Sequence, residues 1–246
     1  MKTKIALVTG ASRGIGNATA HRLARTCDHV ILTAREPADL DETVGRLNRE
    51  GRSASAMELD VTDLDSVRRA ADEVATTYGH LDVLVNNAGI LPEATADRSS
   101  EAVDLSMFRA TFETNLFGAV AVLEAFLPLL RESEGARIVN ISSTMGSLSD
   151  QCNPESPYYG VVVPAYQSSK AALNNVTIGL AKALADTPIK VTSVCPGWVQ
   201  TDLAPGNRDQ APLTADQAAE VVHRAATLDA AAPSGTFQDA NGIVAW

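Results

Sequence analysis

Short apolar runs alternate with longer amphipathic stretches along most of the chain. Runs such as residues 5–8 and 138–141 are followed at once by glycine or serine, which is typical of buried strands in a parallel sheet. The stretches between the runs repeat apolar residues every three or four positions, which predicts helices with one buried face. The predicted strands are residues 5–8, 30–33, 53–59, 81–85, 138–141, 191–195 and 235–237, and the clearest predicted helices are residues 64–78, 106–130, 164–185 and 214–228.

Strands that alternate with helices long enough to cross a sheet form βαβ units. We therefore predict an α/β fold with one doubly wound parallel sheet of about seven strands and helices on both faces. The alternation is not interrupted by a linker, and the sequence contains no repeat of solenoid length. Residues 1–246 are accordingly expected to form a single domain.

Composition narrows the classes of function. The formal net charge of −10 over 246 residues disfavours nucleic acids and anionic membrane surfaces as partners. No apolar run approaches the length of a membrane span, and the apolar stretch near the N-terminus is too short for a signal peptide. The three cysteines, Cys27, Cys152 and Cys195, lack metal-site spacing, so we expect reduced thiols, no metal and a cytoplasmic location.

Three glycines, Gly10, Gly14 and Gly16, lie between the first predicted strand and the first predicted helix. Backbone amides and the helix dipole favour a phosphate at such a turn, and glycine leaves room for it. The alternative is a tight turn with no ligand, but its place between strand and helix favours nucleotide binding. A doubly wound sheet with a nucleotide site at this turn is of the Rossmann type, and residues 1–246 form its single predicted domain.

Polar residues follow several of the predicted strands, where open α/β sheets bind their ligands. They are Thr9, Arg35, Asp60, Asn86, Ser143 and the pair Pro196 and Gly197. Two of them have plainer alternatives. Asp60 precedes a helix and is suited to cap it, and Asn86 is a common turn residue.

Tyr166 and Lys170 are four residues apart in a predicted helix, so their side chains share one face. A lysine ammonium beside a phenol favours the phenolate and lowers the tyrosine pKa from its reference value of about 10. Such a tyrosine can act as a general acid or base toward a carbonyl or an alcohol. The alternative for the isolated pair is an amphipathic helix with a lysine that extends to solvent.

Five segments together resemble the short-chain dehydrogenase/reductase family. They are Thr-Gly-x-x-x-Gly-Ile-Gly at residues 9–16, Asn-Asn-Ala-Gly at 86–89, Ile-Val-Asn-Ile-Ser-Ser at 138–143, Tyr-x-x-x-Lys at 166–170 and Cys-Pro-Gly-Trp-Val-Gln-Thr-Asp at 195–202. The segment around Trp198 and the long spacer before Tyr166 are most similar to the carbonyl-reductase-like branch.

The resemblance implies roles for four residues. Tyr166 would donate the proton, and Lys170 would bind the nicotinamide ribose and tune Tyr166. Ser143 would hold the substrate carbonyl, and Asn115 would order a water molecule in a proton relay through Lys170. Asparagine disfavours the interior of a helix, so a functional role would explain its presence at this position. The alternative is a surface asparagine, which destabilises a helix only slightly.

The resemblance also implies the residues that bind the dinucleotide. They are Gly10, Ser12, Arg13, Gly14, Ile15, Gly16, Arg35, Asp60, Val61, Asn87, Ala88, Gly89, Tyr166, Lys170, Pro196, Gly197, Val199 and Thr201. Relatives that use NAD place an acidic residue where this chain has Ala34, so we expect NADPH/NADP+. Arg13 and Arg35 would converge on the 2′-phosphate, unless both are solvated surface charges.

The expected function is therefore the NADPH-dependent reduction of a ketone or aldehyde, with a small-molecule carbonyl substrate. The alternatives are an NADP-binding regulator without turnover and a non-redox enzyme on this fold. Two loops, about 150–163 and 197–213, are expected to line the substrate pocket, the first as a loop or a short turn of helix. A homodimer or homotetramer is expected, with a monomer as the alternative.

Overall fold

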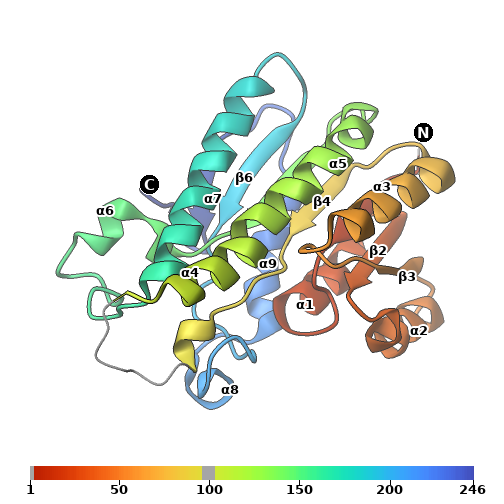
Figure 1. The fold of residues 1–246 in the computed structure, drawn as a ribbon. Helices are drawn as coiled ribbons and strands as arrows, with labels where there is room; N and C mark the ends of the chain where they lie inside the picture. Colours follow the sequence, from red (N-terminus) through yellow and green to blue (C-terminus); the bar gives the residue numbers. More distant parts are fainter. Residues whose placement is uncertain (1–2, 96–102) are drawn as a thin grey trace.

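The computed structural model describes residues 3–95 and 103–246. Its described strands join in one sheet, in the order β3-β2-β1-β4-β5-β6-β7-β8 (Figure 1). The strands are β1 Ile5–Val8, β2 His29–Ala34, β3 Ala54–Glu58, β4 Val83–Asn86, β5 Arg137–Ile141, β6 Lys190–Val194, β7 Thr236–Asp239 and β8 Gly242–Ile243. The predicted α/β architecture is confirmed, and the additional strand β8 is a short one.

Among the described strands, the neighbours from β3 to β7 are parallel and the β7–β8 pair is antiparallel. Strands β2 and β3 lie on one side of β1, and the next strand along the chain, β4, lies on the other side. The strand order therefore reverses between β1 and β4, which is where folds of this type bind their ligand. The sequence analysis missed β8 because two residues are too few to show a strand period.

Helices and short helical turns connect the strands. The α-helices are α1 Gly14–Leu23, α2 Asp41–Arg49, α3 Leu64–Tyr78, α4 Leu105–Phe112, α5 Ala119–Arg131, α6 Leu148–Gln151, α7 Pro164–Ala183, α8 Asn207–Gln210 and α9 Ala215–Ala226. The 3-10 turns are η1 Pro37–Leu40, η2 Pro92–Ala94 and η4 Thr144–Gly146, and a π-helical turn, η3, spans Glu113–Gly118. The spacer expected to be a loop or a short turn of helix begins within α6 and continues as turns.

Side chains alternate between two apolar layers because strand residues point to opposite faces. Leu7 packs in the layer beneath α3 and α5, whereas Val8 packs in the layer beneath α1 and α9. In Figure 1, α3, α5 and α7 cover the nearer face of the sheet and α9 lies behind it. Helices on both faces are thus confirmed.

The stretch Leu105–Arg131 is long and apolar enough to cross a membrane, which our sequence analysis did not anticipate. It belongs instead to the core, since Val122, Phe126 and Leu130 are fully buried in the layer that covers the sheet. The stretch is also not one continuous α-helix as predicted, because η3 widens it around Asn115. The reason lies in the contacts of Asn115, described below.

Candidate active site

The glycine turn after β1 is tied directly to the segment after β4. The Thr9 hydroxyl accepts hydrogen bonds from the amides of Asn87 and Ala88, at 2.9 and 3.0 Å. The Asn87 side chain in turn donates to the carbonyls of Thr9 and Gly10, at 2.8 and 3.0 Å. These contacts join two of the segments expected to hold the cofactor.

The glycines are required by this packing. Gly10 and Gly14 adopt φ values of +62° and +58°, which side chains disfavour. A Cβ atom on Gly16 would lie 2.4 Å from Asn87 Nδ2 and 2.6 Å from the Gly10 carbonyl oxygen. Helix α1 begins at Gly14. Ser12 lies in the glycine turn before the helix, and Ile15 lies in its first turn. The backbone cradle at the amino end of α1 fits the pyrophosphate of a dinucleotide.

The loop after β6 approaches the same cradle. A Cβ atom on Gly14 would lie 3.3 Å from Thr201 Cγ2. This loop leaves β6 through Pro196 and Gly197, and Val199 forms a bridge with Leu213 that closes it. Residues 197–213 therefore fold back beside the glycine turn, with α8 inside the segment predicted to be irregular.

Two further cofactor candidates lie after β3. The Asp60 carboxylate accepts from the amide and the hydroxyl of Thr62, at 2.9 and 2.8 Å, so it organises its own turn. Helix α3 is capped instead by Asp63, whose carboxylate accepts from the Asp65 amide. Val61 packs against Gly118, where a Cβ atom would come within 2.8 Å of it.

Arg13 lies against an acidic residue that the sequence analysis did not consider. Its Nε atom is 3.7 Å from Asp202 Oδ2, and Arg208 also binds the Asp202 carboxylate. That hydrogen bond from Arg208 is the main reason that the pKa of Asp202 lies below its usual value. Arg35 follows β2 and is exposed. The structure thus shows one of the two arginines engaged by a protein carboxylate.

Asn86 supports the sheet from inside the protein. It is 4% exposed, and its side-chain amide donates to Asn140 Oδ1 at 2.9 Å. Asn140 donates onward to Thr177 of α7. Asn86 is the last residue of β4 and its side chain points into the protein, so it braces β4, β5 and α7.

The four residues expected to be catalytic meet near the end of β5: Tyr166 and Lys170 come from α7, Asn115 comes from η3, and Ser143 follows β5. The Lys170 ammonium donates to the Ile141 carbonyl at 2.8 Å and lies 5.6 Å from the centre of the Tyr166 ring. The Ser143 hydroxyl is close enough to the Tyr166 phenol to act on its pKa through a hydrogen bond. Gly89 stands between Lys170 and Asn115, since its Cβ would lie 3.6 and 3.4 Å from their polar atoms.

Asn115 is held by the backbone of the segment after β4. Its Oδ1 accepts from the Ile90 amide at 2.8 Å, and its Nδ2 donates to the Ile90 carbonyl at 2.9 Å. The Nδ2 atom also lies 3.2 Å from the Ser169 hydroxyl of α7. The π-helical turn η3 brings this side chain to the centre of the site, which is a common use of π-turns.

Burial sets the acid–base character of the two ionisable groups. It raises the pKa of Tyr166, with a smaller contribution from nearby Cys195, and the hydrogen bond from Ser143 opposes the shift. Burial likewise lowers the pKa of Lys170 to about 8. We expected the lysine to lower the tyrosine pKa, and that direction is wrong for this structure. The reason is that removing the phenolate from water outweighs the other contributions.

Glu93 is a residue of the site that the sequence analysis did not single out. Its carboxylate accepts from the backbone amides of Ala165 and Tyr166. The two partners lie 72 and 73 residues away along the chain, so no local pattern could have indicated the contact.

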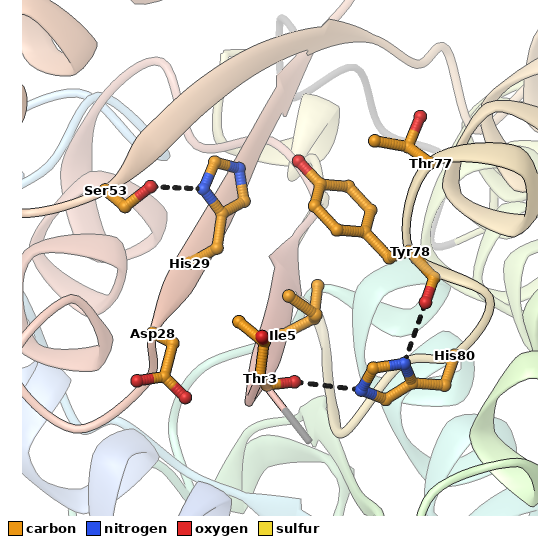
Figure 2. Close-up of a pocket in the computed structure, with 8 residues that line it drawn as sticks. All are labelled: Thr3, Ile5, Asp28, His29, Ser53, Thr77, Tyr78 and His80. Carbon is orange, nitrogen blue, oxygen red and sulfur yellow. Dashed lines mark hydrogen bonds between the residues drawn. The ribbon is translucent and has the colours of Figure 1, made fainter. Parts of the chain in front are cut away.

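A hollow of about 340 Å³ lies beside the amino ends of β1 and β2, at the end of the sheet opposite the proposed catalytic residues (Figure 2). Its two histidines bind other residues of the lining. The His80 ring nitrogens lie 2.9 Å from the carbonyls of Thr3 and Tyr78, and His29 Nδ1 lies 2.7 Å from the Ser53 hydroxyl. These contacts tie the amino ends of the strands together, and none of the residues proposed for chemistry lines this hollow.

Comparison with known proteins identifies the family. A sequence model described as short chain dehydrogenase matches residues 4–212. The chain belongs to the short-chain dehydrogenase/reductase family. The chain is thus an oxidoreductase of this family.

Individual members of the family match over nearly the whole chain. The short-chain dehydrogenase anuI of Penicillium roqueforti is 36% identical over 233 residues, which cover 91% of this chain and 88% of that protein. The NADPH-bound carbonyl reductase from chicken fatty liver superposes with a TM-score of 0.85 at 28% identity, with 100% of both chains covered. A short-chain dehydrogenase from Burkholderia cenocepacia in complex with NADP superposes with a TM-score of 0.80 at 33% identity, over 97% of this chain and 96% of that one.

Proposed function

We propose that this short-chain dehydrogenase/reductase is an NADPH-dependent carbonyl reductase whose residues 1–246 form a single dinucleotide-binding and catalytic domain. The observation that carries the proposal is the meeting of Ser143, Tyr166, Lys170 and Asn115 beside the glycine cradle. These are the groups that reduction of a carbonyl requires: a proton donor, a group that holds the carbonyl oxygen, and a path that returns the proton.

Each group has a task that its surroundings support. Bound NADPH would supply the hydride. Tyr166 gives its phenolic proton to the carbonyl oxygen, and its raised pKa keeps that proton on the phenol at neutral pH. The Ser143 hydroxyl donates a hydrogen bond to the same carbonyl oxygen, where negative charge develops. Lys170 and Asn115 return a proton to Tyr166 from the solvent side.

The preference for NADPH rests on the end of β2. Ala34 stands there instead of a carboxylate, and exposed Arg35 follows it. A guanidinium group suits a 2′-phosphate because its planar donors match phosphate oxygens. Two of the similar solved structures carry NADPH or NADP, which supports the same choice.

The test is loss of the near-ultraviolet absorbance of NADPH when the protein is incubated with quinones, aromatic ketones, aldehydes and β-keto esters. We expect turnover with at least one class. Tight NADPH binding without turnover across the whole panel would instead favour the regulatory alternative. The intact glycine cradle and the Tyr166–Lys170 pair weigh against both that alternative and a non-redox enzyme.

The assembly and location of the protein stay predictions. We propose a homodimer or homotetramer in the cytoplasm. Analytical ultracentrifugation of the purified protein tests the first part, and a monomer at micromolar concentration would contradict it.

A further inference from the structure

Helix α7 carries Tyr166 in its first turn, where backbone amides have no acceptor within the helix. The residue at the N-cap is Val163, whose side chain has no polar atom, and Pro164 has no amide hydrogen. The regular hydrogen bonds of the helix begin with the Gln167 amide, which donates to the Val163 carbonyl at 2.9 Å. The amides of Ala165 and Tyr166 are therefore the ones that need an acceptor from outside the helix.

One carboxylate accepts from both amides. Ala165 N lies 3.0 Å from Glu93 Oε1, and Tyr166 N lies 2.8 Å from Glu93 Oε2. Each carboxylate oxygen thus takes one amide. The negative charge also faces the positive end of a 20-residue helix dipole, which strengthens the contact.

The segment that ends at Glu93 is held at two other points. The amides of Asn87 and Ala88 bind the Thr9 hydroxyl beside the glycine cradle. The backbone of Ile90 binds the Asn115 side chain through both its amide and its carbonyl. Residues 87–93 therefore connect the cradle, the π-helical turn and the first turn of α7 by direct hydrogen bonds.

We propose that Glu93 is a positioning residue, which holds the first turn of α7 and thereby the Tyr166 phenol in place relative to the cofactor-side segment 87–90. The inference rests on the proposed function, in which Tyr166 donates the proton. Proton transfer requires hydrogen-bond distances, so a displacement of about 1 Å is enough to lower the rate about 10²-fold. Glu93 itself does not reach the reacting atoms, since both its oxygens bind the helix backbone.

Three substitutions of Glu93 weaken the contact to different extents. Glu93→Ala removes both acceptors, and Glu93→Gln keeps one acceptor oxygen while turning an NH₂ group toward the second amide. Glu93→Asp keeps the carboxylate on a shorter stem. The matched control is Asp63→Ala, which removes the carboxylate that accepts from the Asp65 amide at 2.9 Å and caps α3, a helix without proposed site residues.

Two measurements are made on each variant, at a temperature well below unfolding. The first is kcat and KM for NADPH and for the best carbonyl substrate. The second is hydrogen exchange of the amides of Ala165 and Tyr166. We expect Glu93→Ala to lower kcat about 10²-fold with KM for NADPH unchanged. Glu93→Gln should lose less of its kcat than Glu93→Ala, and Glu93→Asp should lose the least. Hydrogen exchange at the two amides should likewise accelerate most in Glu93→Ala and least in Glu93→Asp.

Two results would overturn the proposal. If exchange at Ala165 and Tyr166 accelerates but kcat stays equal to that of Asp63→Ala, Glu93 only stabilises the helix. If exchange does not change, the contact itself is refuted. Should Glu93→Ala fail to fold, the Gln and Asp variants carry the test.

A failure of the proposed function gives a different result. The unmodified protein would then reduce no carbonyl compound, although exchange at Ala165 and Tyr166 would still respond to the loss of Glu93. The kinetic and exchange measurements therefore separate the two conclusions.

Discussion

The Lys170 ammonium donates a 2.8 Å hydrogen bond to the carbonyl of Ile141, two residues before Ser143 in the chain. This bond fixes α7 against the end of β5. Tyr166 lies one helical turn before Lys170 on the same face of α7, so the bond also sets the phenol beside the Ser143 hydroxyl. The Lys170 side chain is therefore central to the geometry of the site as well as to its proposed chemistry.

The first prediction concerns pH. Burial disfavours the ammonium form and lowers the pKa of Lys170 to about 8, so the side chain loses its proton as pH rises through that value. We expect kcat/KM for reduction to be constant below this pH and to fall about tenfold per pH unit above it. Lys170→Arg keeps its charge at all working pH values, so any residual activity should lack this decline. A flat profile up to pH 10 in the unmodified protein would contradict the role of Lys170.

The second prediction concerns Tyr166. Tyr166→Phe removes the proton donor and should lower kcat by at least about 10²–10⁴-fold, the usual contribution of general acid catalysis. The affinity for NADPH should change little, as measured by fluorescence titration. The control is Tyr78→Phe. Tyr78 is the last residue of α3 and lines the hollow beside the amino ends of β1 and β2. A Tyr166→Phe variant with most of its kcat intact would remove Tyr166 from the mechanism.

The third prediction concerns cofactor choice. Arg35→Ala should lower kcat/KM with NADPH by about 10–100-fold, which corresponds to a charge-assisted hydrogen bond of about 1.5–3 kcal/mol, and should leave NADH unaffected. Ala34→Asp should shift the preference further toward NADH. Arg13→Ala is expected to have the smaller effect, because Asp202 already binds this guanidinium.

The matched control for the loss of an arginine charge is Arg52. It is exposed and lies before the amino end of β3, whereas Arg35 follows the carboxyl end of β2. Equal kcat/KM for NADH and NADPH in the unmodified protein would refute the proposed preference.

The fourth prediction concerns the spacer before Tyr166. This segment is ordered by its own contacts, since the Ser156 hydroxyl donates to Asp150 at 2.7 Å. The neighbouring Ser149 hydroxyl donates to the Trp246 carbonyl at 2.7 Å. Replacing residues 151–160 with a short Gly-Ser linker should leave NADPH binding intact and raise KM for bulky ketones. Small ketones serve as the internal control, and an unchanged KM for both sizes would exclude the spacer from recognition.

The fifth prediction tests the structural role of Asn86. Asn86→Ala leaves the buried Asn140 oxygen without its donor, and such a loss costs about 1–3 kcal/mol. We expect a lower free energy of unfolding in chemical denaturation with an unchanged Kd for NADPH. A selective loss of NADPH affinity without a loss of stability would contradict this purely structural role of Asn86.

Local patterns were enough to predict most of the fold. The period-two and period-3.6 arrangements of apolar residues depend on neighbours a few positions apart, so the strands from β1 to β7 and the helix α7 could be located from the sequence. The same holds for the Asp63 cap and for the Tyr166–Lys170 pair, whose partners lie within four residues. Two residues of β8 and the widened turn at Asn115 gave no comparable local signal.

The tertiary structure decided what depends on distant partners and on burial. The sequence by itself determined which residues are candidates, through the glycine turn, the serine segment and the Tyr–Lys spacing. Only packing determined that Asp202 engages Arg13, that Asn86 faces Asn140, and that Glu93 accepts from the Tyr166 amide. The direction of the Tyr166 pKa shift was decided in the same way, because desolvation depends on every element packed around the phenol and not on the lysine four residues away.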